Sequence, residues 1–117
     1  MTLRVLLLFL AGLMWAAFAL AADKKTPPWE KPLQKGRYLY LRNCSVCHEI
    51  NKPETSKLGP SLFRMYQNEK LPHSGGTPSE EYFRIKVMFG GDVMPAYVNR
   101  LSAEEIQLLS DFVRSKK

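Results

Sequence analysis

The sequence predicts an all-α domain built from three main helices. In three segments, apolar residues recur at intervals of three and four, which is the period of an amphipathic helix. Two of these segments begin with a capping box, at residues 77–80 and 102–105, where threonine or serine precedes glutamate by three residues. Glycine- and proline-rich stretches separate the segments and are typical of loops. No internal repeat interrupts the pattern, so we expect one domain.

The first residues are not expected to belong to this domain. Arg4 precedes an apolar run over residues 5–20, and Ala19 and Ala21 supply the small residues of an A-x-A cleavage site, which is the pattern of a secretory signal peptide cleaved after Ala21. The alternative is an uncleaved signal that anchors the chain in a membrane, although the run is short for a spanning helix. The expected division is a signal peptide at 1–21, a proline-rich leader at 22–32 and a helical domain at 33–117.

The first helix is expected to begin at Leu33 and to end near residues 48–50. Its apolar stripe consists of Leu33, Gly36, Tyr40 and Cys44. A glycine inside a helix costs about 1 kcal/mol relative to alanine. We therefore expect another helix to cross closely at Gly36, where the missing side chain permits it.

The remaining helices follow from their caps and apolar faces. Ser61–Gln67 is interpreted as a short helix whose inward residues are Leu62, Phe63 and Tyr66. The second main helix starts with the capping box at 77–80 and is stopped by Gly90 and Gly91. Its predicted buried stripe is Tyr82, Ile85 and Phe89. The last helix starts with the capping box at 102–105 and is predicted to bury Ile106, Leu109, Phe112 and Val113.

Both cysteines of the chain lie in the run Cys44-Ser45-Val46-Cys47-His48. The spacing C-x-x-C-H is typical of a c-type haem attachment site, in which two thiols bind one porphyrin edge and the histidine binds iron. Three alternatives remain open at this point. A redox dithiol needs a βαβ context that the chain lacks. A structural zinc site needs four ligands, and only His73 is left to complete the set. An exported protein can also form a simple disulfide.

A second iron ligand is predicted at Met94. Pro95 follows it and disfavours helix at Met94, which holds this thioether on a stiffened loop. Thioethers are soft ligands suited to haem iron. Met65 and Met88 lie in helical patterns and are interpreted as core residues. His73 is the competing ligand, but its proline- and glycine-rich surroundings indicate an exposed loop.

The charge of the chain constrains its partners. The formal net charge is +6, with 17 basic and 11 acidic residues. The basic residues are scattered and are not interleaved with aromatic residues, so we expect no nucleic-acid binding. Most of these charges are expected to form a solvated surface, and the alternative is a basic face that steers the protein onto an acidic redox partner.

Taken together, these motifs resemble those of the class I cytochromes c, over nearly the whole domain. The resemblance rests on Gly36, Tyr40 and the C-x-x-C-H motif, then on Gly59-Pro60-x-Leu62, Met94-Pro95 and a capped last helix. It implies a cytochrome c fold in which three main helices surround one covalently bound haem and the first and last helices cross. One feature departs from the family, because Trp29 lies before the first helix and is no counterpart of the tryptophan that often bonds a haem propionate.

The resemblance also implies roles for individual residues. Cys44 and Cys47 would form the thioether bonds to haem c, His48 would be the proximal iron ligand with its ring N–H on the Pro60 carbonyl, and Met94 would be the distal ligand. Gly36, Tyr40 and Phe112 would lie at the helix crossing.

The function expected from these features is electron transfer. With both axial positions filled, the iron has no open site for a substrate, so we expect a periplasmic carrier of single electrons between redox proteins rather than an enzyme. The alternatives are a dedicated subunit or electron acceptor of a periplasmic dehydrogenase or oxidase, or a ligand-binding or peroxidase-like haem protein if Met94 does not bind iron.

Overall fold

The computed structural model describes residues 31–117, so the expected signal peptide and most of the leader lie outside the described residues. The described chain contains three α-helices, α2 (Pro32–Asn43), α3 (Glu80–Phe89) and α4 (Ala103–Arg114), and one 3₁₀ helix, η2 (Met65–Gln67). Residues 31–117 form no strand, which confirms the all-α class with three main helices. None of the helices in this range is long and apolar enough to cross a membrane.

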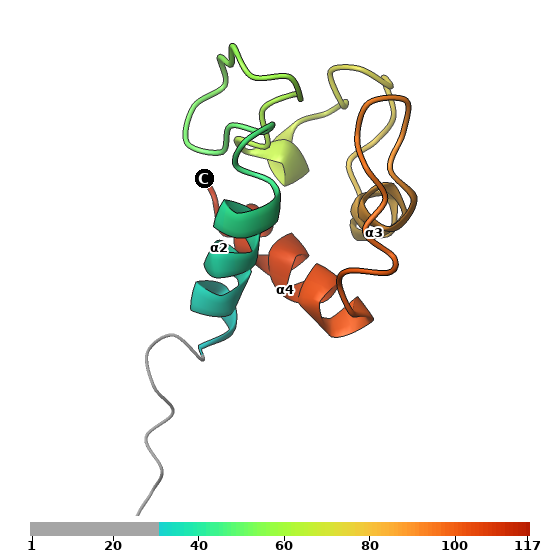
Figure 1. The fold of residues 1–117 in the computed structure, drawn as a ribbon. Coiled ribbons are helices and arrows are strands. Elements are labelled where there is room, and N and C mark those ends of the chain that lie inside the picture. Colours follow the sequence, from blue (N-terminus) through green and yellow to red (C-terminus); the bar gives the residue numbers. More distant parts are fainter. Residues whose placement is uncertain (1–30) are drawn as a thin grey trace, which may run out of the picture.

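Helices α2 and α4 cross at Gly36 (Figure 1). A side chain at Gly36 would collide with the carbonyl oxygen of Leu108, and its Cβ would lie only 2.8 Å from the Cβ of Phe112. The rings of Tyr40 and Phe112 pack beside this point with centroids 5.7 Å apart and planes tilted by 42°. The predicted close crossing at Gly36 is therefore confirmed, and the predicted contact between Tyr40 and Phe112 is a tilted packing.

Helix α4 is the element on which the others pack. The Ser102 hydroxyl accepts from the Glu105 amide, and the Glu105 carboxylate accepts from the Ser102 amide, so the predicted capping box is confirmed. Its buried face contains the four predicted residues, Ile106, Leu109, Phe112 and Val113, together with Ser110. Helices α2 and α3 both pack on α4 but not on each other, and Figure 1 shows α4 between them. This arrangement leaves the region between α2 and α3 to the loops.

The predicted bounds of the first helix need two corrections. Pro32, assigned to the leader, is the first residue of α2, where its missing N–H is tolerated because first-turn amides have no intrahelical partner. The helix ends at Asn43 rather than near residues 48–50, because the Tyr40 carbonyl accepts from the amides of both Cys44 and Ser45 and breaks the regular pattern. Leu33 is exposed, and Leu39 takes its place in the core.

The predicted buried face of the second main helix was wrong. Phe83 and Val87 are buried, whereas Ile85 and Phe89 are exposed and Tyr82 is half-buried. This helix carries apolar residues on more than one of its faces, so their spacing does not single out a buried face. The face that packs on α4 differs from the predicted one. Its cap also differs, because Ser79, not Thr77, accepts from the Tyr82 amide. The predicted stop at Gly90 is confirmed by its left-handed φ of 68°.

The short helix predicted at residues 61–67 is shorter than expected. Only Met65–Gln67 is helical within 61–67, and Arg64 before it has a left-handed φ of 51°. Leu62, Phe63 and Tyr66 are half-buried, and Met65 is the residue that reaches the core. The Tyr66 hydroxyl bonds the Ser110 hydroxyl at 2.6 Å, which fixes η2 on α4.

Candidate functional site

The two cysteines and His48 lie on a tight turn immediately after α2. The amides of Cys47 and His48 both donate to the Cys44 carbonyl, at 3.0 and 2.9 Å. Both cysteines are free thiols and are partly buried. Burial raises the pKa of the Cys44 thiol to about 11, with a smaller contribution from the charge of Cys47, so this thiol is protonated at neutral pH. The turn thus brings two thiols and one imidazole together within five residues.

The His48 ring is oriented by Pro60. Its Nδ1 lies 2.8 Å from the Pro60 carbonyl oxygen. Because a carbonyl only accepts, Nδ1 carries the hydrogen, and Nε2 is left with a free lone pair. A hydrogen bond at the second ring nitrogen is how proteins fix the tautomer and orientation of an imidazole that binds a metal. His48 is therefore prepared to bind a metal ion through Nε2.

Gly59 permits this contact by having no side chain. A Cβ at Gly59 would lie 2.7 Å from His48 Nδ1, which is closer than real Cβ contacts, and would also press on the neighbouring ring carbon. The Gly59 amide in turn donates to the Cys47 carbonyl at 2.7 Å. Gly59 and Pro60 therefore contact the Nδ1 edge of the imidazole, and the Gly59 amide joins their loop to the cysteine turn.

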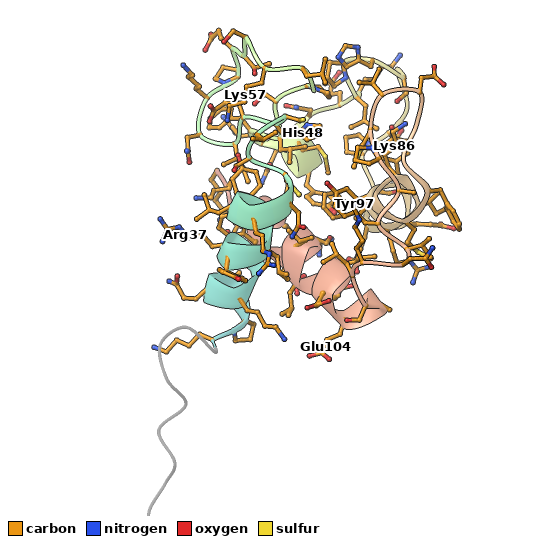
Figure 2. All side chains as sticks on the ribbon, in the orientation of Figure 1. Arg37, His48, Lys57, Lys86, Tyr97 and Glu104 are labelled. Atoms are coloured by element: carbon orange, nitrogen blue, oxygen red, sulfur yellow. The ribbon has the colours of Figure 1, made fainter. Side chains whose placement is uncertain are left out.

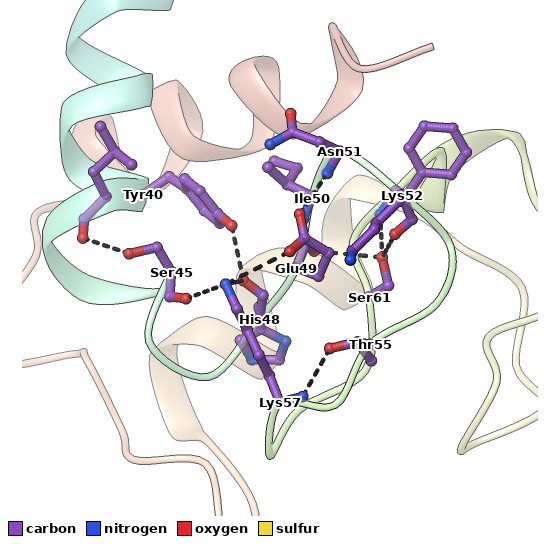
Figure 3. A network of polar contacts seen from close by, with 12 residues as sticks. Tyr40, Ser45, His48, Glu49, Ile50, Asn51, Lys52, Thr55, Lys57 and Ser61 are labelled. Atoms are coloured by element: carbon purple, nitrogen blue, oxygen red, sulfur yellow. Dashed lines mark hydrogen bonds and ion pairs between the residues drawn. The ribbon is translucent and has the colours of Figure 1, made fainter.

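A polar network holds the backbone around His48 (Figure 3). The Tyr40 hydroxyl donates to the His48 carbonyl at 2.8 Å, and the Lys57 ammonium donates to the carbonyls of Ser45 and His48 at 2.6 and 3.3 Å. Lys57 also pairs with the Glu49 carboxylate at 3.7 Å. Burial, followed by the charges of Glu49 and Cys44, raises the pKa of Tyr40 to about 12, so its hydroxyl remains a donor. Lys57 was not predicted from the sequence, because a lysine in a polar loop has no distinguishing pattern.

The hydrogen bonds of Glu49 complete this network. Its carboxylate accepts from the amides of Ile50 and Asn51 at 2.8 and 2.9 Å, and these bonds lower its pKa. The segment that follows His48 therefore turns sharply and leads into the loop that carries Lys57 and Gly59. The histidine is held at its ring and at its own carbonyl.

Met94 lies on the loop that follows α3. It is half-buried and packs against the core. The Gly91 amide donates to the Met94 carbonyl at 2.9 Å, and the amides of Tyr97 and Val98 donate to the carbonyls of Val87 and Met88 in α3. A side chain at Gly90 would collide with the Met94 carbonyl, so glycine is required there.

Tyr97 connects this loop to the cysteine turn. Its hydroxyl donates to the Asn43 carbonyl at 2.9 Å, and Asn43 immediately precedes Cys44. Burial raises the pKa of Tyr97, and the charges of Cys44 and Cys47 raise it further, which is consistent with a hydroxyl lying close to the thiols. The loop of Met94 and the turn of His48 therefore meet at the end of α2. Sequence reasoning missed Tyr97, because its partner is 54 residues away.

The structure gives no support to the other uses of the cysteines. The described residues contain no group of three or more histidine, cysteine or acidic side chains that could hold a metal ion. His73 is exposed and lines a separate cavity of about 580 Å³ with residues such as Arg64 and Lys70, without either cysteine. The thiols are not joined in a disulfide, and residues 31–117 have no strand for a βαβ unit. Trp29 lies outside the described residues.

The donors and their surroundings fit an apolar, iron-containing macrocycle. Two thiols, an imidazole with a free Nε2 and a thioether are the donor set of a covalently bound haem. Three large apolar side chains near these residues in the chain are exposed: Val46 between the two cysteines (85% exposed), Leu58 before Gly59 (73%) and Val93 before Met94 (67%). Exposed apolar side chains of this size are typical of surfaces that a ligand or a partner covers.

Two comparisons with known proteins agree with this geometry. Residues 31–113 match the family model described as "Cytochrome C oxidase, cbb3-type, subunit III". The fold is similar to a crystal structure of cytochrome c6 from the diatom Phaeodactylum tricornutum, with a TM-score of 0.54 and 25% sequence identity. That match covers 71% of this chain and 91% of the cytochrome c6 chain.

Proposed function

This chain belongs to the cytochrome c family described as cytochrome c oxidase, cbb3-type, subunit III, and we propose that it is a periplasmic electron carrier whose single haem is ligated by His48 and Met94. It is a small monohaem c-type cytochrome with the cytochrome c fold. Family membership accounts for the covalent haem c, for which Cys44 and Cys47 supply the C-x-x-C pattern. Ligation of the iron by His48 and Met94 and the periplasmic location are the parts that we propose beyond family membership.

The observation that carries the proposal is the bond between His48 and Pro60. The distance of 2.8 Å from Nδ1 to the Pro60 carbonyl leaves Nε2 as the free donor of this ring. Tyr40 and Lys57 hold the carbonyl of the same residue. A histidine fixed at both ends loses little freedom when it binds iron, and the bond at Nδ1 makes Nε2 a stronger donor.

Met94 is proposed as the second ligand. Its loop is stiffened by Pro95 and is joined through Tyr97 to the residue before Cys44. Met65 is buried in the core, and Met88 lies within α3, as the helical pattern predicted. His73, the other candidate, is exposed on a loop that lines a different cavity.

With these ligands the chain is an electron carrier and not an enzyme by itself. The bound haem supplies a one-electron couple between ferric and ferrous iron. The two thiols would hold the haem covalently, and His48 and Met94 would be its iron ligands, which would leave no open position for a substrate. Interactions of such carriers with their partners are small and weak, which permits fast exchange. The excess of basic residues favours an acidic surface on the partner.

The first test is the absorption spectrum of the protein expressed with a cytochrome c maturation system. We expect a c-type reduced spectrum and, in the ferric state, the weak far-red band of methionine-ligated haem. Met94→Ala should lose the far-red band, whereas Met65→Leu should keep it. A c-type spectrum without that band in the unmodified protein would exclude Met94 and favour gas binding or peroxidase chemistry.

The periplasmic location is a separate part of the proposal. It depends on a signal peptide at residues 1–21, which lie outside the described residues. Mass spectrometry of the purified protein should give a mature chain that begins at Ala22. An intact Met1 would indicate an uncleaved signal and a membrane-anchored cytochrome.

The family description favours one further candidate function, that of a dedicated subunit of a larger oxidoreductase. A subunit would be purified from its source in a stable complex, whereas a mobile carrier would be recovered alone. Size-exclusion chromatography of the haem-stained protein from mild extracts separates the two, and a free monomer is the result that we expect.

A further inference from the structure

The backbone of segment 90–98, which carries Met94, is hydrogen-bonded to α3 and to the residues that follow it, but not to α2. The amides of Tyr97 and Val98 donate to the Val87 and Met88 carbonyls at 3.0 and 3.1 Å, and the Gly91 amide closes the turn on Met94. Helix α3 packs on α4 and not on α2. None of these backbone bonds therefore fixes the loop to the helix that leads into Cys44.

The Tyr97 side chain supplies the direct link to α2. Within residues 31–117, its bond to the Asn43 carbonyl at 2.9 Å is the only side-chain hydrogen bond that segment 90–98 makes. The ring is 8% exposed, and Figure 2 shows Tyr97 between α2 and α3. The Asn43 carbonyl lies at the end of α2, where carbonyls have no intrahelical donor. The Tyr97 hydroxyl satisfies it.

We propose that Tyr97 is the positioning residue for Met94, and that its hydrogen bond to Asn43 clamps the distal loop to the haem-attachment end of α2. The inference rests on the proposed ligation by Met94. With the clamp closed, the Met94 thioether would remain available to the iron and would compete with small ligands. Without it, no hydrogen bond joins segment 90–98 to α2, and the loop should open more often.

A phenylalanine at this position would fill the same space and lack only the directed bond. A part-buried hydrogen bond contributes about 1 kcal/mol on average. Removing it from a single loop should raise the open population about fivefold, since 1.4 kcal/mol corresponds to tenfold. Holding the loop to α2 is thus assigned to the Tyr97 hydroxyl and not to its ring.

The test compares Tyr97→Phe with Tyr66→Phe in the haem-loaded protein. Tyr66→Phe also removes one part-buried hydroxyl hydrogen bond, to Ser110 at 2.6 Å. That bond joins η2 to α4 and involves no residue of the segments that carry His48 and Met94. The probe is imidazole, whose binding to the ferric protein is limited by departure of the methionine. Tyr97→Phe should bind imidazole about fivefold faster than the unmodified protein, and Tyr66→Phe should bind it at the unmodified rate.

The outcomes separate this inference from the proposed function. An unmodified protein without the far-red band refutes ligation by Met94 and, with it, the clamp. If the band is present and Tyr97→Phe binds imidazole at the unmodified rate, the clamp alone is wrong. Equal acceleration in both variants would show a general loss of stability and would also overturn it.

A measurement on the unmodified protein keeps the proposal testable if Tyr97→Phe fails to retain haem. In proton NMR of the ferrous protein, the Tyr97 hydroxyl proton should exchange slowly with water because it is bonded to Asn43. A hydroxyl proton in fast exchange would contradict the clamp.

Discussion

The two segments that carry the proposed iron ligands are held in different ways. In residues 44–60, the His48 ring is hydrogen-bonded to the Pro60 carbonyl, and the backbone carbonyl of His48 accepts from Tyr40 and Lys57. These partners lie in the same short part of the chain or in the adjoining helix α2. In residues 90–98, the backbone is bonded to α3, and Tyr97 makes the only side-chain bond to another element of the described chain. We infer that the distal ligand is the first to yield to any perturbation.

The largest expected effect comes from removing each ligand in turn. His48→Ala removes the residue on which the proximal network converges, so we expect little stable holoprotein. Met94→Ala should keep the covalent haem and an open sixth position that binds carbon monoxide in the ferrous state. Haem-stained yield and carbon monoxide difference spectra measure both. Normal holoprotein yield from His48→Ala would contradict the assignment of the proximal ligand.

A matched pair of glycine substitutions gives the next largest effect. Gly59→Ala places a Cβ 2.7 Å from His48 Nδ1, and Gly90→Ala forces a residue with φ of 68° against the Met94 carbonyl. Each should lower the free energy of unfolding by about 1–3 kcal/mol. Their absorption spectra should differ. Gly90→Ala should lose the far-red band while His48 remains bound to iron, whereas Gly59→Ala should displace the His48 ring and change the spectrum through that ligand. Identical spectra for the two variants would remove the distinction between the segments.

The features that the sequence predicted are those with local signals. The C-x-x-C-H run, the capping box at Ser102 and the buried face of α4 all lie within one or two helical turns, so that spacing alone determines them. The close crossing was predictable because Gly36 is costly in a helix unless another backbone approaches it. The site candidates Cys44, Cys47 and His48 belong to this class.

The features that were missed depend on tertiary contacts. Apolar residues surround α3, so its spacing fits a face with Ile85 and Phe89 as well as the observed face with Phe83 and Val87, and only packing on α4 decides. Lys57 contributes through backbone carbonyls of residues 9 and 12 positions away. The bond from Tyr97 to Asn43 spans 54 residues. None of these contacts has a periodic signature.

A smaller effect is expected from the hydroxyl of Tyr40. Tyr40→Phe removes the bond to the His48 carbonyl but keeps the ring against Phe112. We expect the free energy of unfolding to fall by about 1 kcal/mol. Because Lys57 still bonds the same carbonyl, the far-red band should be retained. Chemical denaturation followed by circular dichroism measures the first quantity, and loss of the band would show that the proximal contacts also govern the distal ligand.

The smallest effect is expected from Lys57. Its ion pair with Glu49 is partly exposed and screened by solvent, so Lys57→Met should cost no more than about 1 kcal/mol of unfolding free energy. The control is Lys52→Met, which removes an exposed charge from the same loop and should be neutral. The same denaturation experiment compares them, and equal values would mean that the bonds from Lys57 to the Ser45 and His48 carbonyls add no stability.

The most direct test of the difference between the two segments is a guanidinium titration of the ferric holoprotein. The far-red absorption band would report the proposed bond from Met94 to iron, and far-ultraviolet circular dichroism reports the helices. We predict that the band disappears at a lower guanidinium concentration than the helical signal, because the distal loop is released before the helices unfold. A single coincident transition, or a native protein without the band, would contradict this account.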